Sequence, residues 1–350
     1  MATPHQMVGC PARDQSAPAL PAASIARAFR SAVTAANEFA GSTSPNPPVG
    51  CAVLDRQGEI LACAAHERAG LPHAEAAAID ICRRAGVVDR IDTLVVTLEP
   101  CNHFGRTPPC SEAILSTPAR TVWIGAADSN LHVVGAGAAR LQAQGVSVQF
   151  LERLEDPEAQ QLLQAVRRLI GPFAKWSLTG LPWITLKQAL TVDGGMIPPP
   201  GHKTFTSTAS LILAHNLRRR ADAIVTGSGT VLADEPHFTI RHVKDHDGKR
   251  RHLAVFDRRG RVPSLYCDAA RMRGFDVSLE QDIVLALTRL GSLNVMEVLV
   301  EAGPTLLNAF LDRDLWDEHV IIRRRADSPD RDTVEIVTRT DLSPTNCKGI

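Results

Sequence analysis

The sequence predicts an α/β protein with two domains, and three observations carry that prediction. The chain has 350 residues, enough for two hydrophobic cores at about 150 residues per domain. Helical and strand patterns alternate around a hairpin in residues 23–150, an order that predicts helices on both faces of one mixed sheet. A second alternating pattern opens at residues 183–187, so we expect another α/β domain there.

The elements of the first domain follow from hydrophobic periodicity and from turn residues. Ile25, Phe29 and Val33 recur at near-helical spacing, and prolines in residues 41–48 predict a loop. Asp-Arg-Gln-Gly at residues 55–58 separates two apolar runs, which predicts a β-hairpin. The expected order is a helix over 23–40, strands over 49–54 and 60–65, a helix over 73–85, a strand over 93–98, a helix from Pro109, and two strand-plus-helix segments ending near Phe150.

The second domain is predicted by the same kind of alternation. Residues 183–187 read as its first strand, and the tail from Arg323 is polar, so we expect that tail to be irregular. Between them we expect a helix over about 207–219, strands over 223–226, 253–256 and 296–300, and a helix after Gly303.

The segments of the chain differ in composition. Residues 1–22 are rich in Pro, Ala and polar residues and lack a continuous apolar stretch, which predicts a disordered lead-in and no signal peptide. Residues 23–150 form the first predicted domain, and residues 176–350 form the second. The charged helical pattern of residues 151–175 predicts a connector between them.

Composition excludes several classes of function. The 38 basic residues are balanced by 38 acidic ones, so the chain has no charge bias toward nucleic acid or an anionic membrane. Aromatic residues make up 4% of the chain, with one tyrosine, which argues against a base-stacking platform. No apolar run approaches the roughly 18 residues of a membrane span. We expect a cytoplasmic enzyme acting on a small molecule, and a homo-oligomer is compatible with that expectation.

One group of residues has the chemistry of a metal site. Eight cysteines in a chain without an export signal indicate thiols or metal ligands rather than disulfides. His73, Cys101 and Cys110 supply one imidazole and two thiolates, a donor set suited to one tetrahedral Zn²⁺ with a fourth position open for water. Glu75, two residues from His73, could move protons to and from that water. The order His-x-Glu, Pro-Cys, Cys is typical of zinc deaminases, although eight residues separate these cysteines instead of two.

Spacing alone leaves other interpretations open. His103 lies between the two cysteines and could close a structural zinc site as a fourth ligand in a binding protein. The two cysteines could also be unrelated thiols. The carboxylate of Glu75 favours the catalytic interpretation, because a structural site has no use for it.

Several motifs together resemble the bifunctional riboflavin-biosynthesis deaminase/reductases. They occupy residues 43–51, 66–75 and 97–110, and the last contains the distinctive Gly-Arg-Thr-Pro-Pro. The resemblance implies a cytidine-deaminase-like α/β/α sandwich with zinc on His73, Cys101 and Cys110, and with Glu75 as proton shuttle. The implied reaction is hydrolytic deamination of a diaminopyrimidinone ribosylamino 5′-phosphate.

Neighbouring polar residues are candidates for binding this substrate. Asn46 could offer its amide to the ring edge or to a ribose hydroxyl, and His66 and His103 could hydrogen-bond the substrate. Arg106 has the forked guanidinium suited to a phosphate.

Residues 183–194, 221–236, 255–263 and 300–306 resemble the reductase half of the same family. The resemblance implies a dihydrofolate-reductase-like fold and NADPH-dependent reduction of the ribosyl group to ribityl. Backbone N–H groups at a helix start could hold the pyrophosphate. The implied substrate contacts are Arg218, Arg241 and Glu301, and the implied cofactor contacts are Thr230, Asp234, Gly303 and Thr305.

A second enzymatic interpretation stays open. Residues 202–206 lack the tryptophan of the family pattern, and the segment between Pro263 and Ile283 is short. The chain could therefore be a diverged deaminase-only paralogue that feeds a pyrimidine-derived secondary metabolite, with an altered reductase half.

Overall fold

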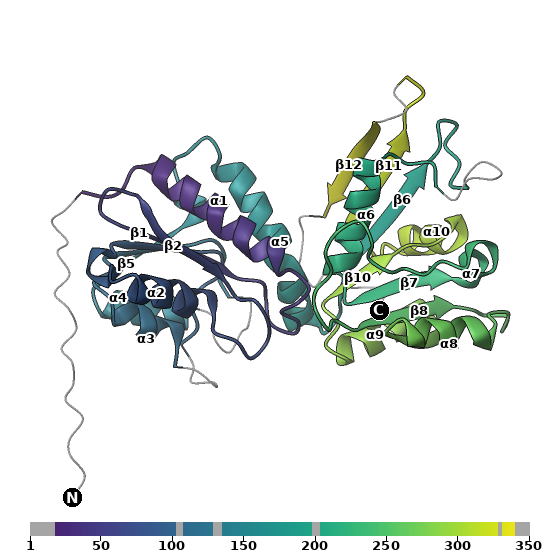
Figure 1. Ribbon diagram of the computed structural model, residues 1–350, viewed down its shortest axis with the longest axis horizontal. Helices are drawn as coiled ribbons and strands as arrows, with labels where there is room; N and C mark the ends of the chain where they lie inside the picture. Colours follow the sequence, from purple (N-terminus) through teal and green to yellow (C-terminus); the bar gives the residue numbers. More distant parts are fainter. Residues whose placement is uncertain (1–17, 103–107, 129–134, 198–203, 328–330, 340–350) are drawn as a thin grey trace, which may run out of the picture. The chain divides into compact units, whose positions relative to one another are not determined.

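The computed structural model describes residues 18–102, 108–128, 135–197, 204–327 and 331–339. The chain divides into two compact units, the first ending at Ala174 and the second beginning at Lys175 (Figure 1). The boundary falls inside one helix, α5 (Ala159–Thr179). In the described ranges no helix is long and apolar enough to cross a membrane.

The first unit is built on a mixed sheet of five strands in the order β2-β1-β3-β4-β5. The predicted hairpin is confirmed: β1 pairs antiparallel with both β2 and β3, whereas β3, β4 and β5 are parallel. The strands are β1 (Gly50–Leu54), β2 (Ile60–Ala65), β3 (Thr93–Val96), β4 (Thr121–Ile124) and β5 (Ser147–Phe150).

Helices cover both faces of this sheet (Figure 1). Strand side chains alternate between the faces, so Ala52 and Leu54 pack toward α1 and α5 while Cys51 and Val53 pack toward the opposite layer. The helices are α1 (Ala22–Glu38) with α5 on one face, and α2 (Ala74–Arg84), α3 (Cys110–Leu115) and α4 (Ala136–Ala143) on the other, with 3-10 turns η1 (Val88–Arg90) and η2 (Leu151–Arg153).

The second unit contains a sheet of seven strands in the order β12-β11-β6-β10-β7-β8-β9. All neighbouring strands are parallel except β12, which is antiparallel to β11. The strands are β6 (Trp183–Leu190), β7 (Ala223–Gly227), β8 (Arg251–Phe256), β9 (Phe275–Glu280), β10 (Glu297–Val300), β11 (Glu318–Arg324) and β12 (Asp332–Thr338).

Helices also cover both faces of this second sheet. Ile224 and Leu299 contribute to the face that α6 and α8 cover, and Val225 and Val300 contribute to the face that α9 and α10 cover. The helices are α6 (Thr208–Arg220), α7 (Ser228–Asp234), α8 (Ser264–Met272), α9 (Ile283–Ser292) and α10 (Pro304–Asp312). The predicted architecture, an α/β/α sandwich followed by a second α/β domain, is confirmed.

The structure contains elements that the sequence did not predict, among them α8, β9 and β11, and two expected segments differ from their prediction. The tail after Arg323, expected to be irregular, contains β12, so that expectation is wrong for residues 332–338. The helix expected from residue 151 begins at Ala159, and Leu162, Val166 and Leu169 bury its first half against the core of the first unit.

Candidate active sites

The three predicted metal ligands lie together in the first unit. His73 is the N-cap of α2, Cys101 follows the end of β3, and Cys110 is the first residue of α3. Their ligand atoms all lie within 4.8 Å of one another. The His73 Nδ1 atom is 3.6 Å from the Cys101 sulfur and 3.3 Å from the Cys110 sulfur.

These distances fit a zinc ion. In a tetrahedral site, bonds of about 2.3 Å to sulfur and about 2.0 Å to nitrogen place these ligands about 3.5 Å apart. The Cys110 thiol and His73 both hydrogen-bond the Cys101 sulfur, and the Cys110 backbone N–H donates to it at 3.3 Å, which together lower the pKa of Cys101 to about 4. The pKa of Cys110 is raised in turn by Cys101. A divalent cation would neutralise both sulfurs as thiolates.

Glu75 is placed beside this site by the first turn of α2. Its side chain is 3% exposed and contacts the Cys110 sulfur. Burial raises the pKa of Glu75, with the charge of Cys101 adding to it and the backbone, His73 and Cys110 opposing it. A carboxyl group with a raised pKa holds a proton more readily than an exposed one, which suits a group that accepts a proton and releases it again.

A second buried glutamate holds the segment before Cys101 in place. The Glu99 carboxylate accepts the backbone N–H groups of Gly135 at 3.2 Å and Ala138 at 3.0 Å, at the start of α4. A Cβ atom on Gly137 would lie 1.8 Å from the Pro100 carbonyl oxygen, so only glycine allows this approach. The start of α4 is therefore packed directly on the backbone that presents a metal ligand.

Asn46 and His66 lie next to each other and next to His73. The Asn46 Nδ2 atom is 3.1 Å from His66 Nε2, and His66 Nδ1 is 3.0 Å from the Pro72 carbonyl oxygen. The His66 ring packs edge-on against the His73 ring at 5.3 Å. Burial lowers the pKa of His66. His103 and Arg106 lie outside the described residues. The alternative of a closed zinc site, with His103 as its fourth ligand, is therefore not tested.

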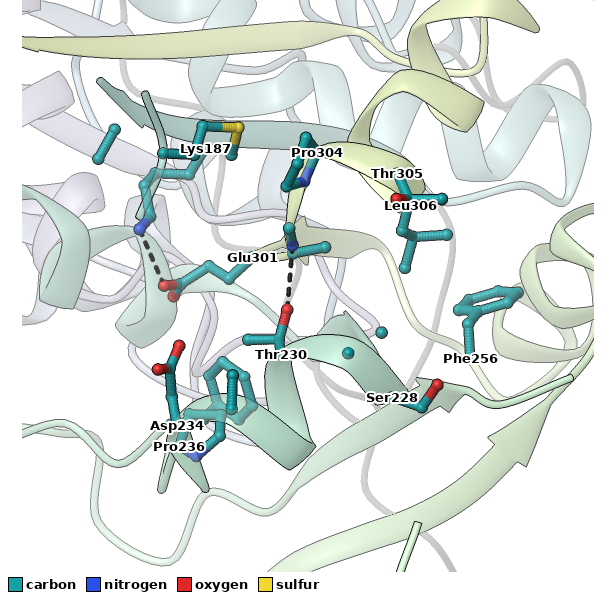
Figure 2. Close-up of a pocket in the computed structure, with 18 of the residues that line it drawn as sticks. Lys187, Ser228, Thr230, Asp234, Pro236, Phe256, Glu301, Pro304, Thr305 and Leu306 are labelled. Atoms are coloured by element: carbon teal, nitrogen blue, oxygen red, sulfur yellow. Dashed lines mark hydrogen bonds and ion pairs between the residues drawn. The ribbon is translucent and has the colours of Figure 1, made fainter. Parts of the chain in front are cut away.

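The second site is a cavity of about 1160 Å³ in the second unit (Figure 2). The parallel strands β6, β10, β7 and β8 end at one edge of the sheet, and residues that follow three of them line the cavity. Such a position is the usual site for nucleotides in open parallel sheets. The structure brings together here all seven residues predicted for the reductase: Arg218, Thr230, Asp234, Arg241, Glu301, Gly303 and Thr305.

Glu301 is held by two cations at the edge of this cavity, and Figure 2 shows the contact with one of them, Lys187. Its oxygens accept from Arg218 Nε at 2.5 Å and Nη2 at 2.9 Å, and Lys187 Nζ lies 3.2 Å away. Burial alone would raise the pKa of Glu301, but Arg218 and Lys187 outweigh burial and lower it to about 2. The sequence analysis did not single out Lys187, although it lies in the segment 183–194 that resembles the reductase half.

One backbone N–H group at the start of α10 already forms a hydrogen bond within the protein. Gly303 N donates to the Thr230 hydroxyl at 3.0 Å, so α7 and α10 are linked at the cavity wall (Figure 2). Thr305 and Asp234 are exposed in the same wall. Thr230 can still donate its hydroxyl hydrogen to a ligand.

His215 is another lining residue that the sequence did not single out. Its side chain is 3% exposed, and its Nδ1 atom accepts the Arg241 backbone N–H at 2.9 Å. Burial and the charge of Arg218 lower the pKa of His215 to about 4, so the ring is neutral.

A cationic loop after β8 completes the cavity. Buried Asp257 fixes the loop by accepting a backbone N–H at 2.7 Å, and one of its arginines donates to Ser228 Oγ at 3.2 Å. None of these arginines forms an ion pair with any residue in the part of the chain that the structure describes. They are Arg258, Arg259 and Arg261. The loop can bind a phosphate group.

Together the two units define a class of protein: a zinc-dependent deaminase joined to a nucleotide-dependent reductase. Residues 23–126 match the cytidine and deoxycytidylate deaminase zinc-binding region, and residues 182–323 match the RibD C-terminal domain.

Relatives match both units at once. The riboflavin biosynthesis protein RibD of Mycobacterium tuberculosis is 35% identical over 295 residues, which cover 82% of this chain and 81% of that protein. RibD of Aquifex aeolicus is 33% identical over 313 residues, covering 83% and 84%.

Solved structures of similar proteins also match the chain across both units. Acinetobacter baumannii RibD matches with a TM-score of 0.72 and 28% identity, covering 87% of this chain and 88% of that one. A Thermotoga maritima deaminase/reductase has the same TM-score and identity, covering 86% and 87%. This chain belongs to the RibD family of bifunctional riboflavin-biosynthesis deaminase/reductases. Its cofactors are Zn²⁺ and NADPH.

Proposed function

We propose that the two sites catalyse successive steps on one phosphorylated pyrimidine. The first unit replaces an exocyclic amine of a diaminopyrimidinone ribosylamino 5′-phosphate with oxygen, and the second reduces the ribosyl group to ribityl. The Thermotoga maritima relative is described as a diaminohydroxyphosphoribosylaminopyrimidine deaminase and 5-amino-6-(5-phosphoribosylamino)uracil reductase. The observation that carries the proposal is the His73, Cys101 and Cys110 cluster with Glu75 buried beside it.

In the deaminase site, Glu75 moves the protons. Zinc, held by His73, Cys101 and Cys110, supplies the Lewis acidity that makes water a nucleophile at neutral pH. Glu75 takes both protons of the attacking water and passes one to the ring nitrogen and one to the leaving amine, so that the C–N bond breaks and the products are a ring carbonyl and ammonia. The raised pKa of Glu75 suits a group that must gain and lose a proton in each turnover.

The substrate is held by polar groups around this site. Asn46 offers an amide to the ring edge or to a ribose hydroxyl, and Arg106 pairs with the 5′-phosphate. His103 is a further candidate for a substrate hydrogen bond. The amide of Asn46 is half-buried and anchored to His66, which supports its assignment.

In the reductase site, NADPH supplies the hydride for the ribosyl carbon. The start of α10, from Gly303 to Thr305, lies where backbone N–H groups can hold a pyrophosphate. Arg258 and Arg259 lie at the end of β8, where an arginine can pair with a 2′-phosphate. The Lys187 ammonium donates the proton that the reduction requires, with Glu301 fixing its position.

The deaminase-only alternative is not favoured. The similarity to bifunctional relatives extends over both units, and the second unit retains a large cavity with Glu301, Arg218 and Lys187 in contact. A purely structural zinc site is also not favoured, because Glu75 is buried against Cys110.

The variant Glu75→Gln tests the deaminase mechanism. Glutamine keeps the size of the side chain but cannot shuttle protons, so ammonia release should fall about 10²- to 10⁴-fold. Zinc content, measured by metal analysis, should remain at one ion per chain. Reductase turnover on the deaminated product is the folding control within the same molecule. Unchanged ammonia release would exclude Glu75 as the proton shuttle.

A further inference from the structure

We propose that His66 is a positioning residue that orients the amide of Asn46, and that it does not itself touch the substrate. The inference rests on the proposed role of Asn46 in substrate binding. His66 is 2% exposed, and both of its ring nitrogens already have partners within the protein.

The hydrogen bonds fix the direction of the Asn46 amide. The Pro72 carbonyl oxygen can only accept, so His66 Nδ1 carries the hydrogen that joins them at 3.0 Å. His66 Nε2 then presents a lone pair and accepts from Asn46 Nδ2 at 3.1 Å. The opposite orientation of the amide would bring its oxygen against that lone pair. The NH₂ end of Asn46 is therefore turned toward His66, and its carbonyl oxygen is turned away.

Backbone contacts hold the two partners at a fixed separation. His66 N donates to the Val49 carbonyl at 2.8 Å, and Asn46 N donates to the Thr43 carbonyl at 2.8 Å. Ser42 Oγ donates to the carbonyl of the residue after His66 at 2.5 Å. The contacts of Val49 and Ser42 thus tie the two ends of the loop that carries Asn46 to the segment that carries His66, and the contact between Asn46 and Thr43 closes a turn within the loop.

The same ring also reaches the metal site. Its partner Pro72 directly precedes His73, and the His66 and His73 rings pack edge-on at 5.3 Å. One buried imidazole therefore sets the position of Asn46 relative to a zinc ligand. The amide offers the substrate a carbonyl acceptor, which selects a ring amine or a ribose hydroxyl as donor.

A double-mutant cycle on ammonia release tests this inference. Losing one neutral hydrogen bond that orients Asn46 should raise the KM of the His66→Ala variant about 3- to 10-fold. Zinc content and reductase turnover should stay unchanged. If His66 acts through Asn46, then adding His66→Ala to an Asn46→Ala variant should cause no further loss.

Three further variants make the cycle decisive. Glutamine at position 66 can accept from Asn46 and donate to Pro72, so His66→Gln should recover part of the lost kcat/KM. His66→Leu, which fills part of the space of the ring but makes neither hydrogen bond, takes the place of His66→Ala in the cycle if the alanine variant loses zinc. Arg68→Ala, an exposed neighbour, is the matched control and should behave as the wild type.

The outcomes separate the inference from the function on which it rests. Losses that multiply in the double variant would mean that His66 contacts the substrate independently, which overturns the inference alone. An Asn46→Ala variant with full activity would overturn the assignment of Asn46, and the inference with it.

Discussion

Glu75 in the first unit and Glu301 in the second are buried to a similar degree, at 3% and 6% exposure, yet their pKa values move in opposite directions. Burial dominates at Glu75 and raises its pKa. Arg218 and Lys187 dominate at Glu301 and lower its pKa to about 2. We therefore expect the same side chain to serve as a proton carrier in one unit and as a permanent anion in the other, because of the neighbouring cations.

The two sites also differ in extent. The metal site uses three ligands that lie within 4.8 Å of one another, whereas the reductase cavity occupies about 1160 Å³ along the ends of several strands. A bound ion is held by a small rigid set of donors. A dinucleotide needs a long surface with charged groups spaced along it.

Removal of zinc should have the largest effect, and it should abolish the deaminase activity while leaving the reductase activity in place. A strong chelator should bring ammonia release to background, because the nucleophile depends on the metal. Reductase turnover on the deaminated product should persist, since none of the cavity residues is a zinc ligand. Re-addition of Zn²⁺ should restore deamination. Equal loss of both activities would contradict independent sites.

Glu301→Gln should destabilise the second unit, because it leaves Arg218 and Lys187 buried beside a neutral group. A pKa lowered from 4.5 to about 2 corresponds to stabilisation of about 3 kcal/mol at pH 7. Because the folded pKa is depressed, this stabilisation is present above pH 4.5 and is lost as the pH falls toward 2. The difference between wild type and variant should therefore shrink in that range.

Urea unfolding by tryptophan fluorescence measures this difference. Three of the four tryptophans lie in the second unit, so a Trp123→Phe background restricts the signal to that unit. Glu335→Gln on the exposed strand β12 is the control. A difference that did not depend on pH would contradict the charge-based explanation.

Replacing Arg258 and Arg259 together by alanine should alter cofactor preference. If these arginines bind the 2′-phosphate, then the KM for NADPH should rise about 10-fold, an effect typical of lost charged hydrogen bonds. The KM for NADH should not change. Steady-state kinetics with both cofactors is the measurement, and an equal rise for both would place the arginines elsewhere on the cofactor. Deamination is the internal control.

Thr230→Val should have the smallest effect. The change removes the acceptor of the Gly303 N–H at 3.0 Å and keeps the shape of the side chain. We expect a loss of about 1 kcal/mol in stability of the second unit and a rise of a few-fold in the KM for NADPH. Thr230→Ser, which retains the hydroxyl, should restore both. No recovery with serine would show that the methyl group, not the hydrogen bond, matters.

Local patterns predicted the elements and the metal ligands but not the contacts between distant segments. His73, Cys101 and Cys110 are recognisable because zinc demands particular donors. Lys187 was not singled out, and His66 was named only as a candidate for contacting the substrate, because a single lysine in a strand and a single histidine after one have many ordinary uses. Only the folded chain shows that Lys187 meets Glu301 and that His66 meets Asn46.

The missed strand β12 has a related explanation. Seven residues of β12 pair with β11, but its side chains from Thr333 to Thr338 are all exposed. A strand without a buried face has no inward side chains to impose the hydrophobic alternation from which strands are predicted. The strand forms because it pairs with β11, and that pairing cannot be read from the residues of β12 alone.

Gly137 shows how far the constraints of a metal centre extend along the chain. It binds no metal and touches no substrate, yet a single methyl group there would meet the Pro100 carbonyl at 1.8 Å and push on the backbone of the next residue, Cys101. The geometry of the proposed zinc site therefore also constrains a helix that contributes no ligand. A natural variant at this position would present as a loss of metal, with every coordinating side chain intact.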